Sequence, residues 1–192
     1  MSARFDPSSY TELRMAKTDI AGLGVIALAV FGDDRGWFKE NYNREKMTQI
    51  GLPASFDPIQ QNVAYNNKRG VTRGIHAEPW DKYITIAAGS VFAAIVDFRK
   101  GPTFGKTLTF ELNPGMGLFV PKGCGNSYQT LDDDTVYTYL VNDYWSPEAK
   151  YVSVNVADPD LNIKWPVPLD MAEISPKDKA APQFKDIQPM EV

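Results

Sequence analysis

The chain has 192 residues, which is enough for one domain with a hydrophobic core but few for two domains. Hydrophobic residues make up 43% and the net charge is -4, which argues against disorder and against an electrostatic footprint for nucleic acid or a membrane. Because Cys124 is the only cysteine, no intrachain disulfide is expected, and we predict a reducing, cytoplasmic compartment. The N-terminus is charged and has no apolar core, so we expect no signal peptide. The chain contains no apolar run of about 18 residues, so we expect no membrane-spanning helix.

The first quarter of the chain contains a polar segment, a β-rich run and a predicted helix, in this order. Residues 1–20 are polar and predict an N-terminal arm, either extended along a partner subunit or frayed. A β-rich run over 24–31 follows and is closed by a Gly-Asp-Asp turn. Residues 43–51 predict a short helix, because Asn43 can cap its start and Gly51 can end it.

Short strands at nearly regular spacing dominate the rest of the barrel-forming segment. The β-rich runs lie at 58–66, 71–77, 83–99, 106–112, 117–121, 126–131 and 136–145, and the third predicts two strands that meet near Gly89. This spacing favours a sandwich or barrel, because parallel βαβ units need helical crossovers for which the chain has no room. We therefore expect an all-β barrel domain over 21–158, with a few short peripheral helices. A proline-rich tail over 159–192 is expected to pack on this barrel.

His76 is the only histidine, so the usual zinc and iron sites with two or three His ligands are excluded. A lone histidine is more often structural than catalytic, but Arg73 and Lys82 lie nearby in sequence. Together they would give a positive field that suits an anionic ligand and favours a neutral imidazole, although each alone is also explained as a surface charge. Because side chains alternate along a strand, Arg73 would face away from His76 unless Gly74 marks a bulge.

Two stretches resemble the two motifs of the cupin barrel, RGIHAEPWDKYITIAAG and GLFVPKGCGNSYQ. In metal-binding cupins these motifs supply His and Glu ligands. Here Glu78 stands at the second His position of the first motif, and Asn126 stands where the second motif has a His. One His and one Glu are too few to hold zinc or iron, so we predict no metal and a pocket for acid–base chemistry or plain binding.

Tyrosines are the other candidates for proton transfer. Tyr137 and Tyr139 share one face of their predicted strand. Most aromatic residues on barrel strands belong to the core, but a phenol aimed into a polar pocket can act as a general acid. No GxGxxG motif is present to bind a redox cofactor, and no cofactor is expected.

Over nearly its whole length the chain resembles dTDP-4-dehydrorhamnose 3,5-epimerases. The matching stretches, in family order and with near-family spacing, are FGDDRGWFKENY, IQQNVAYN, RGIHAEPWDKYI, VDFRKGPTFG, VPKGCGNSYQTL, YLVNDYWSPE, ADPDLNIKWP and ISPKDKAAP. Together they are highly specific, whereas any one alone would be weak. RGIHAEPWDK and YLVNDYWSPE are most similar to a subgroup that includes epimerase domains fused to a dTDP-4-dehydrorhamnose reductase.

This resemblance implies a fold, an activity and partners. The fold is the cupin-type double-stranded β-helix, a jelly-roll barrel. The activity is that of a cofactor-independent isomerase that binds a dTDP-sugar. The implied partners are a second copy of the chain in a homodimer, with an N-terminal strand that can be exchanged, and a reductase to which the enzyme is functionally coupled.

The resemblance also assigns four catalytic residues. His76 is the base, and Asp178 of the ISPKD stretch orients it. Lys82 steadies the developing enolate, and Tyr139 is the general acid. Seven further residues are implied to bind the substrate, with the first two often acting in a neighbouring subunit's site: Arg35, Glu40, Gln60, Asn62, Arg73, Asn126 and Trp145.

The chain departs from the family pattern at several of these positions. Many relatives have a His at the position of Asn126 and a Tyr at the position of Trp145. Lys150 stands where many relatives carry an acidic residue. Asn126 can still hydrogen-bond in place of the His, and Trp145 keeps an aromatic face.

The predicted function is conversion of dTDP-4-dehydro-6-deoxy-D-glucose to dTDP-4-dehydro-L-rhamnose, by proton abstraction and return at C3 and C5. One alternative is a relative that epimerises a single carbon or isomerises a related nucleotide 4-keto sugar. Another is a cupin that binds a nucleotide sugar without catalysis. The set of His76, Lys82, Tyr139 and Asp178 argues against the pure binder, because binding alone needs no base and acid.

Overall fold

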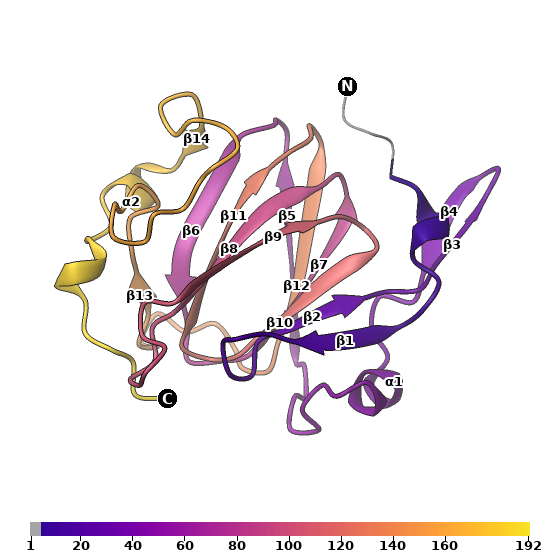
Figure 1. Cartoon of the computed structure of the whole chain (residues 1–192), viewed down its shortest axis with the longest axis horizontal. Helices are drawn as coiled ribbons and strands as arrows, with labels where there is room; N and C mark the ends of the chain where they lie inside the picture. Colours follow the sequence, from indigo (N-terminus) through magenta and orange to yellow (C-terminus); the bar gives the residue numbers. More distant parts are fainter. Residues whose placement is uncertain (1–4) are drawn as a thin grey trace.

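The computed structural model describes residues 5–192 and consists mainly of antiparallel strands in two facing sheets (Figure 1). The first sheet contains, in spatial order, β1 (Arg14–Lys17), β2 (Gly24–Ala27), β10 (Met116–Val120), β7 (Lys82–Ala88), β12 (Thr135–Val141) and β5 (Gln60–Asn66). The second contains β13 (Val152–Ser153), β6 (Val71–Ala77), β11 (Cys124–Thr130), β8 (Val91–Asp97) and β9 (Thr107–Leu112), with β14 (Glu173–Ile174) parallel to β6. The predicted cupin-type jelly roll with a few short helices is thus confirmed.

The main core fills the space between the two sheets. Because side chains alternate along each strand, one face of β7 and one face of β8 meet there. The buried residues of this core include Ile84, Ile86, Val91, Ala93, Ile95, Leu118 and Tyr137. The two strands predicted within 83–99 are confirmed as β7 and β8, and Gly89 between them has a φ of 71°.

The helix predicted at 43–51 is confirmed as α1 (Arg44–Gln49). The side chain of Asn43 caps it by accepting a hydrogen bond from the backbone N–H of Lys46, and Gly51 follows its end with a φ of 107°. Met47 of α1 is buried against one end of the barrel, next to Phe56 and Phe119.

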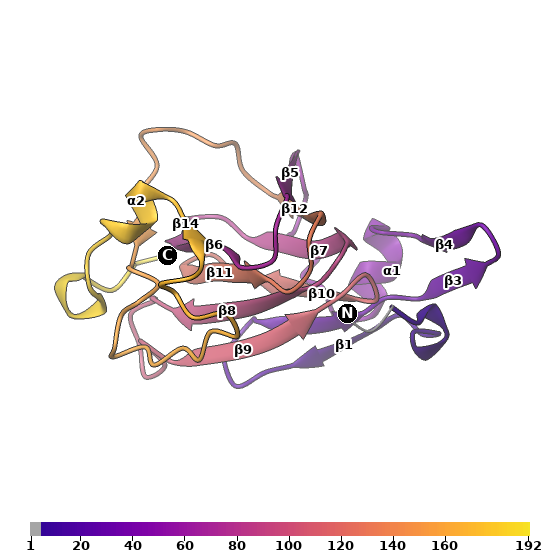
Figure 2. The same ribbon diagram turned by 90° about the horizontal axis from the view of Figure 1, so that it is seen from above.

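A two-stranded hairpin, β3 (Val30–Asp33) and β4 (Gly36–Lys39), projects away from the barrel (Figure 2). The β-rich run predicted over 24–31 is present, but it is divided between β2 and β3. The chain passes the end of β10 here, where the backbone N–H of Leu28 bonds to the carbonyl of Gly115. Beyond that point β10 offers no partner, so the run pairs with β4 instead, and the turn lies one residue later than expected.

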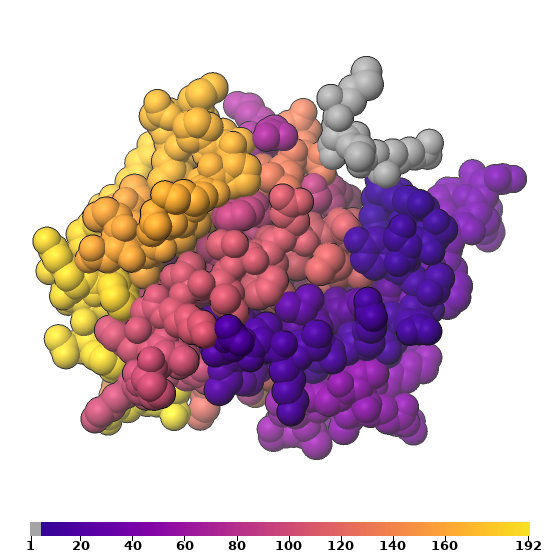
Figure 3. Space-filling model, viewed as in Figure 1, coloured from indigo at the N-terminus to yellow at the C-terminus, as the bar shows by residue number. Residues whose placement is uncertain are grey.

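The C-terminal segment packs on the outer face of the second sheet. Its orange and yellow atoms lie at the left of the space-filling view in Figure 3. It contains β14, α2 (Pro176–Lys179) and a 3-10 turn at Phe184–Asp186. A second core forms beneath it from apolar residues of the sheet and the tail: Ile75, Ala77, Val96, Phe98, Val154, Val156, Leu161 and Met190. Strands β6 and β8 are therefore buried on both faces.

The predicted N-terminal arm contains a 3-10 turn at Pro7–Ser9 and the edge strand β1. Its residues 1–4 lie outside the described part of the chain. Over residues 5–192, no helix has both the length and the apolar character needed to cross a bilayer.

Strand β6 carries an irregularity that shapes the pocket. Arg73 pairs with Tyr128 and His76 pairs with Asn126, so two residues of β6 oppose one residue of β11. Gly74, in this bulge, has a φ of 119°, and an added Cβ would lie 2.8 Å from the carbonyl oxygen of Asn126, so only glycine fits. The extra residue changes the alternation of side chains, so the bulge that Gly74 could mark is present.

Candidate active site

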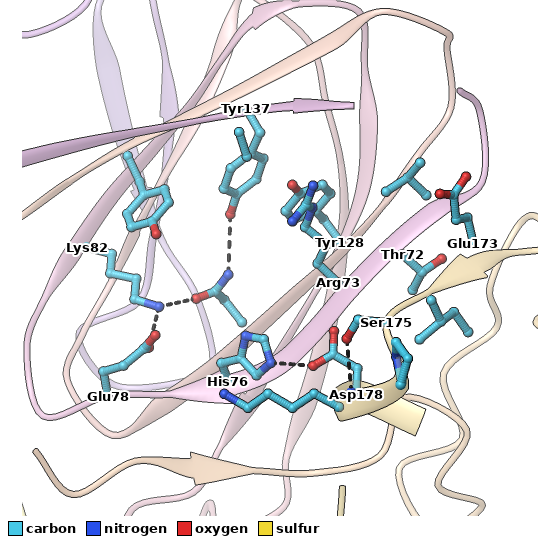
Figure 4. Close-up of a pocket in the computed structure, with 17 residues that line it drawn as sticks. Thr72, Arg73, His76, Glu78, Lys82, Tyr128, Tyr137, Glu173, Ser175 and Asp178 are labelled. Carbon is cyan, nitrogen blue, oxygen red and sulfur yellow. Dashed lines mark hydrogen bonds and ion pairs between the residues drawn. The ribbon is translucent and has the colours of Figure 1, made fainter. Parts of the chain in front are cut away.

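A cavity of about 530 Å³ opens between the two sheets at the end of the barrel nearest the tail. Strands β6, β11, β7 and β12 contribute its walls, and residues 173–178 close one side (Figure 4). The bulge in β6 lets Arg73 and His76 both reach this cavity despite their spacing. Of the residues predicted from sequence, the structure brings six together in its lining: Arg73, His76, Lys82, Asn126, Tyr139 and Asp178.

His76 and Asp178 form a hydrogen-bonded pair. Nε2 of His76 lies 2.7 Å from Oδ1 of Asp178, which is 7% exposed. Burial would raise the pKa of Asp178, but hydrogen bonds from His76, from the backbone N–H of Gly74 and from Ser175 hold it below its ordinary value. The carboxylate is therefore ionised and accepts the Nε2 proton, which leaves Nδ1 of the imidazole to accept a proton from a ligand.

The short helix α2 positions this carboxylate. Ser175 caps α2, because its Oγ accepts a hydrogen bond from the backbone N–H of Asp178 at 3.1 Å. Strand β14, directly before the cap, pairs with Val71 and Thr72 of β6, the strand that also carries His76. The tail thus delivers Asp178 to His76 through backbone pairing and a cap.

Lys82 is a buried cation at the opposite side of the pocket. Its ammonium forms an ion pair with Glu78, donates to Oδ1 of Asn126 at 2.6 Å, and lies 5.7 Å from the ring centre of Tyr139. Burial lowers the pKa of Lys82, and the carboxylate of Glu78 raises it. A cation in such a dry place can stabilise a developing oxyanion strongly, since little water competes for it.

Three tyrosines form one side of the cavity. Tyr128 and Tyr137 stack with ring centres 4.1 Å apart, and Tyr139 meets Tyr137 edge to face. Burial is the main cause that raises the pKa of Tyr139, and Glu78 raises it further while Arg73 lowers it. Tyr139 therefore keeps its proton near neutral pH, as a general acid must.

The other predicted binding residues lie outside this cavity. Gln60 and Asn62 sit on the same face of β5 as Ala64, which lines it, and Asn62 pairs with Tyr139 across the strands. Trp145 is 63% exposed in the loop after β12, where its backbone N–H donates to Gln60.

Arg35 and Glu40 lie at and just after the projecting β3–β4 hairpin. The side chain of Arg35 is 90% exposed and pairs with Asp33 in the hairpin turn. Glu40 pairs with Lys46 of α1. Neither residue lines the pocket of its own chain.

The pocket also contains polar residues for which no role is predicted from the sequence. They are Thr72, Tyr128, Glu173, Ser175 and Lys177, together with Glu78, which was weighed only as a metal ligand. The alternation of Tyr128 with Asn126 along one strand, and the Ser-Pro start of a helix before Asp178, are signals that could have indicated two of them. Within the described residues, no group of three or more His, Cys, Asp and Glu is placed to hold a metal ion.

Similar proteins share this architecture over almost the whole chain. The family model described as dTDP-4-dehydrorhamnose 3,5-epimerase matches residues 17–186. A Streptococcus pyogenes protein named Protein RmlC homolog is 46% identical over 178 residues, which cover 90% of this chain and 89% of that protein. The structure of RmlC from Streptococcus suis in complex with dTDP-D-xylose is 45% identical, with a TM-score of 0.89, and covers 93% of this chain and 95% of that chain.

A more distant structure is also informative. It is that of a double mutant of ChmJ, a 3'-monoepimerase from Streptomyces bikiniensis, in complex with dTDP. It is 29% identical to this chain with a TM-score of 0.80, and the match covers 89% of this chain and 87% of that chain.

The depressed pKa of Asp178 predicts a pH-dependent contribution to stability. A carboxyl whose pKa is lower in the folded than in the unfolded chain stabilises the fold above its unfolded pKa, and this contribution is lost as the pH falls through the folded pKa. We expect Asp178→Asn to lower the free energy of unfolding most above the ordinary carboxyl value of 3.8, and progressively less below it. Urea unfolding at several pH values measures this difference.

The matched control is Asp170→Asn, which removes an exposed carboxylate from the same tail. Its effect should be smaller at neutral pH than that of Asp178→Asn. A loss of stability in Asp178→Asn that is the same at every pH would contradict a charge-dependent role for the pair.

Proposed function

The chain belongs to the dTDP-4-dehydrorhamnose 3,5-epimerase family, and we propose that it converts dTDP-4-dehydro-6-deoxy-D-glucose to dTDP-4-dehydro-L-rhamnose. The observation that carries the proposal is one pocket in which the His76–Asp178 pair lies across from Lys82 and Tyr139. Such a pocket contains a base, an acid and a stabilised cation, which are the groups that proton exchange next to a ketone requires.

The substrate's 4-keto group makes the protons on C3 and C5 acidic, because removing either leaves an enolate. His76 accepts the proton at Nδ1, since Nε2 is already engaged with Asp178. The carboxylate stabilises the imidazolium that forms, and it holds the ring in one orientation and tautomer. Asp178 is thus a positioning residue for the base.

The negative charge of the enolate gathers on the carbonyl oxygen at C4. Lys82 meets this oxygen with an N–H that neither Glu78 nor Asn126 occupies. One preorganised donor of this kind typically lowers the barrier by about 3 kcal/mol. Because Lys82 is almost fully buried, water does not screen the interaction.

Inversion needs a proton from the face opposite the base. His76 projects from β6 in one sheet and Tyr139 projects from β12 in the other, so the two reach the cavity from facing walls. A base that returns its own proton restores the starting configuration, whereas Tyr139 delivers a proton to the other face. Exchange at both C3 and C5 requires the pair to act twice or the sugar ring to flip.

We further propose that the enzyme is a homodimer in which the hairpin of one subunit completes the pocket of the other. Arg35 and Glu40 lie away from the pocket of their own chain. Phe31 and Phe38 on the same hairpin are 63% and 68% exposed, as expected of a surface that another subunit covers. The guanidinium of Arg35 would then reach an anionic group of the partner's substrate.

Two expectations follow from the chemistry and the composition. The product keeps its 4-keto group, so a reductase that reduces it is the natural functional partner. The buried, free thiol of Cys124 fits a reducing cytoplasm, where we place the enzyme.

The second candidate is an epimerase of a single centre. Its support is the similarity to ChmJ, a 3'-monoepimerase with the same barrel. Both candidates use the same base and acid, and they differ in how many carbons exchange their protons.

The decisive experiment is proton NMR of dTDP-4-dehydro-6-deoxy-D-glucose with the protein in D2O. We expect deuterium at both C3 and C5, because one enolate chemistry serves both carbons. His76→Asn should slow exchange by about 100- to 10,000-fold, the usual contribution of a general base. The variant should still unfold cooperatively, although loss of the hydrogen bond to Asp178 should lower its unfolding midpoint.

Exchange at C3 alone would identify a single-centre epimerase. Absence of exchange in the folded native protein would leave only nucleotide-sugar binding. A His76→Asn variant with nearly native rates would remove His76 from the role of base.

Tyr139→Phe separates proton removal from inversion. The variant keeps His76 and Lys82, so deuterium should still enter recovered substrate. Without the phenol, formation of the inverted product should fall by about 100- to 10,000-fold. The measurement compares deuterium in substrate with the amount of epimerised product in the same sample.

Tyr65→Phe, on the exposed face of β5, is the matched control and should leave both rates unchanged. Equal loss of exchange and inversion in Tyr139→Phe would show that the phenol is not the acid that acts after the enolate forms.

Subunit complementation tests the shared pocket. Arg35→Ala and His76→Asn should each be nearly inactive as homodimers, because each disables both pockets. When the two are mixed and allowed to exchange subunits, the mixed dimer contains one pocket with both native residues. We expect turnover to reappear in the mixture, measured against the two parents alone.

Turnover in the mixture that only equals the average of the two parents would contradict a site shared between subunits. Light scattering of both variants must show dimers for this comparison.

A further inference from the structure

Glu78 has a buried carboxylate for which the reaction as described provides no role. It follows β6 directly and faces Lys82, the first residue of β7 (Figure 4). The two side chains are only 15% and 6% exposed. Removing two such charges from water costs several kcal/mol per ion in general, so the pair is not explained by stability alone.

Lys82 is the ion-pair partner of this carboxylate. Among the described residues, its Oε2 makes no hydrogen bond besides the ion pair with the ammonium. The position is one at which metal-binding cupins carry a metal ligand, and here the carboxylate binds an ammonium instead.

The ammonium of Lys82 has three N–H donors. One is directed at Glu78, and a second is donated to Oδ1 of Asn126. Asn126 is held in turn by Tyr137, whose hydroxyl lies 3.4 Å from its Nδ2. One donor therefore remains, and two fixed partners determine its direction.

We propose that Glu78 is a positioning residue for the epimerisation, which keeps Lys82 protonated and aims its remaining N–H at the carbonyl oxygen of the substrate. The proposal rests on the proposed function and deepens it, since it identifies the group that prepares the electrophile. Asn126 also helps to orient the ammonium of Lys82, but only Glu78 carries the negative charge that keeps a buried ammonium protonated.

The surroundings of Lys82 support this assignment. Charged and titratable groups face the pocket from three directions: Arg73 and His76 from β6, Tyr128, Tyr137 and Tyr139 from β11 and β12, and Glu173, Lys177 and Asp178 from the tail. Only Glu78 forms an ion pair with Lys82 in the described structure. The same carboxylate raises the pKa of Tyr139, so it helps both the cation and the acid to keep their protons.

The test is the pH dependence of turnover in Glu78→Gln. Glutamine keeps the size and an oxygen acceptor but removes the charge, so burial would act on Lys82 without compensation. The rate falls where Lys82 or Tyr139 loses its proton, and we expect this alkaline limb of kcat to move to lower pH. At neutral pH we expect kcat to fall by about tenfold or more. A loss of this size is usual when a residue that orients a substrate-contacting group is removed.

Glu78→Asp keeps the charge with a side chain one methylene shorter. It should retain an alkaline limb close to the native one while its kcat is reduced, because the aim of the ammonium is loosened. Glu111→Gln, on the exposed side of β9, controls for loss of a carboxylate and should show the native profile.

A direct measurement of the protonation of Lys82 distinguishes its titration from that of Tyr139. Nitrogen-15 NMR of selectively labelled lysine should show Lys82 losing its proton at lower pH in Glu78→Gln than in the native protein. This measurement needs no substrate, so it remains valid if the proposed reaction fails.

The outcomes distinguish the two levels of the argument. Native protein without exchange in D2O would overturn the proposed function, whereas active native protein with an unmoved alkaline limb in Glu78→Gln would overturn only the role of Glu78. If Glu78→Gln does not fold, Glu78→Asp provides the test. An alkaline limb of kcat that moves to lower pH in Glu78→Asp, although the charge is kept, would overturn the proposal.

Discussion

The hydrogen bond between His76 and Asp178 joins parts of the chain that are 102 residues apart, and the pocket depends on it. The imidazole belongs to a strand in the middle of a sheet, while the carboxylate belongs to a four-residue helix in the tail. So short a helix is not stable alone, since nucleation is costly. The second core, where Leu161 and Met190 pack on the outer face of the sheet, therefore positions the carboxylate of Asp178.

The two-sheet architecture solves a problem of direction. Inversion needs a base and an acid on opposite faces of the sugar, and a single sheet would present both from one side. The jelly roll places β6 and β12 in different sheets, so His76 and Tyr139 approach the same space from opposite walls. The bulge at Gly74 adds Arg73 to the same wall as His76, which regular alternation would forbid.

Sequence patterns predicted the features that depend on local chemistry. Capping by Asn43 located the helix, and the glycine between Arg73 and His76 indicated the bulge, since each signal acts within a few residues. The division of 24–31 was not predicted, because burial alternates without interruption along it while the pairing partner changes. Pairing depends on where distant strands end, and residue types alone do not contain that information.

The same limit applies to the candidate site. The family resemblance assigned His76, Lys82, Tyr139 and Asp178, and the structure brings all four to one cavity. The link from Glu78 to Lys82 was missed, because a turn separates them and the cupin motif suggested a metal ligand instead. Only the fold shows that the carboxylate points back at the ammonium.

The charges in the pocket divide into two kinds, and this division explains how one cavity both binds and reacts. His76 and Lys82, to which the proposed reaction assigns the base and the oxyanion donor, each have a mostly buried carboxylate partner. Arg73 is exposed at the rim, forms no ion pair in the described residues, and donates one N–H to Asn66. Under the proposed function its remaining donors would bind the diphosphate, whose charge needs a cation that no carboxylate has already neutralised. The proposed function thus assigns the paired charges to the chemistry and the unpaired cation to the binding.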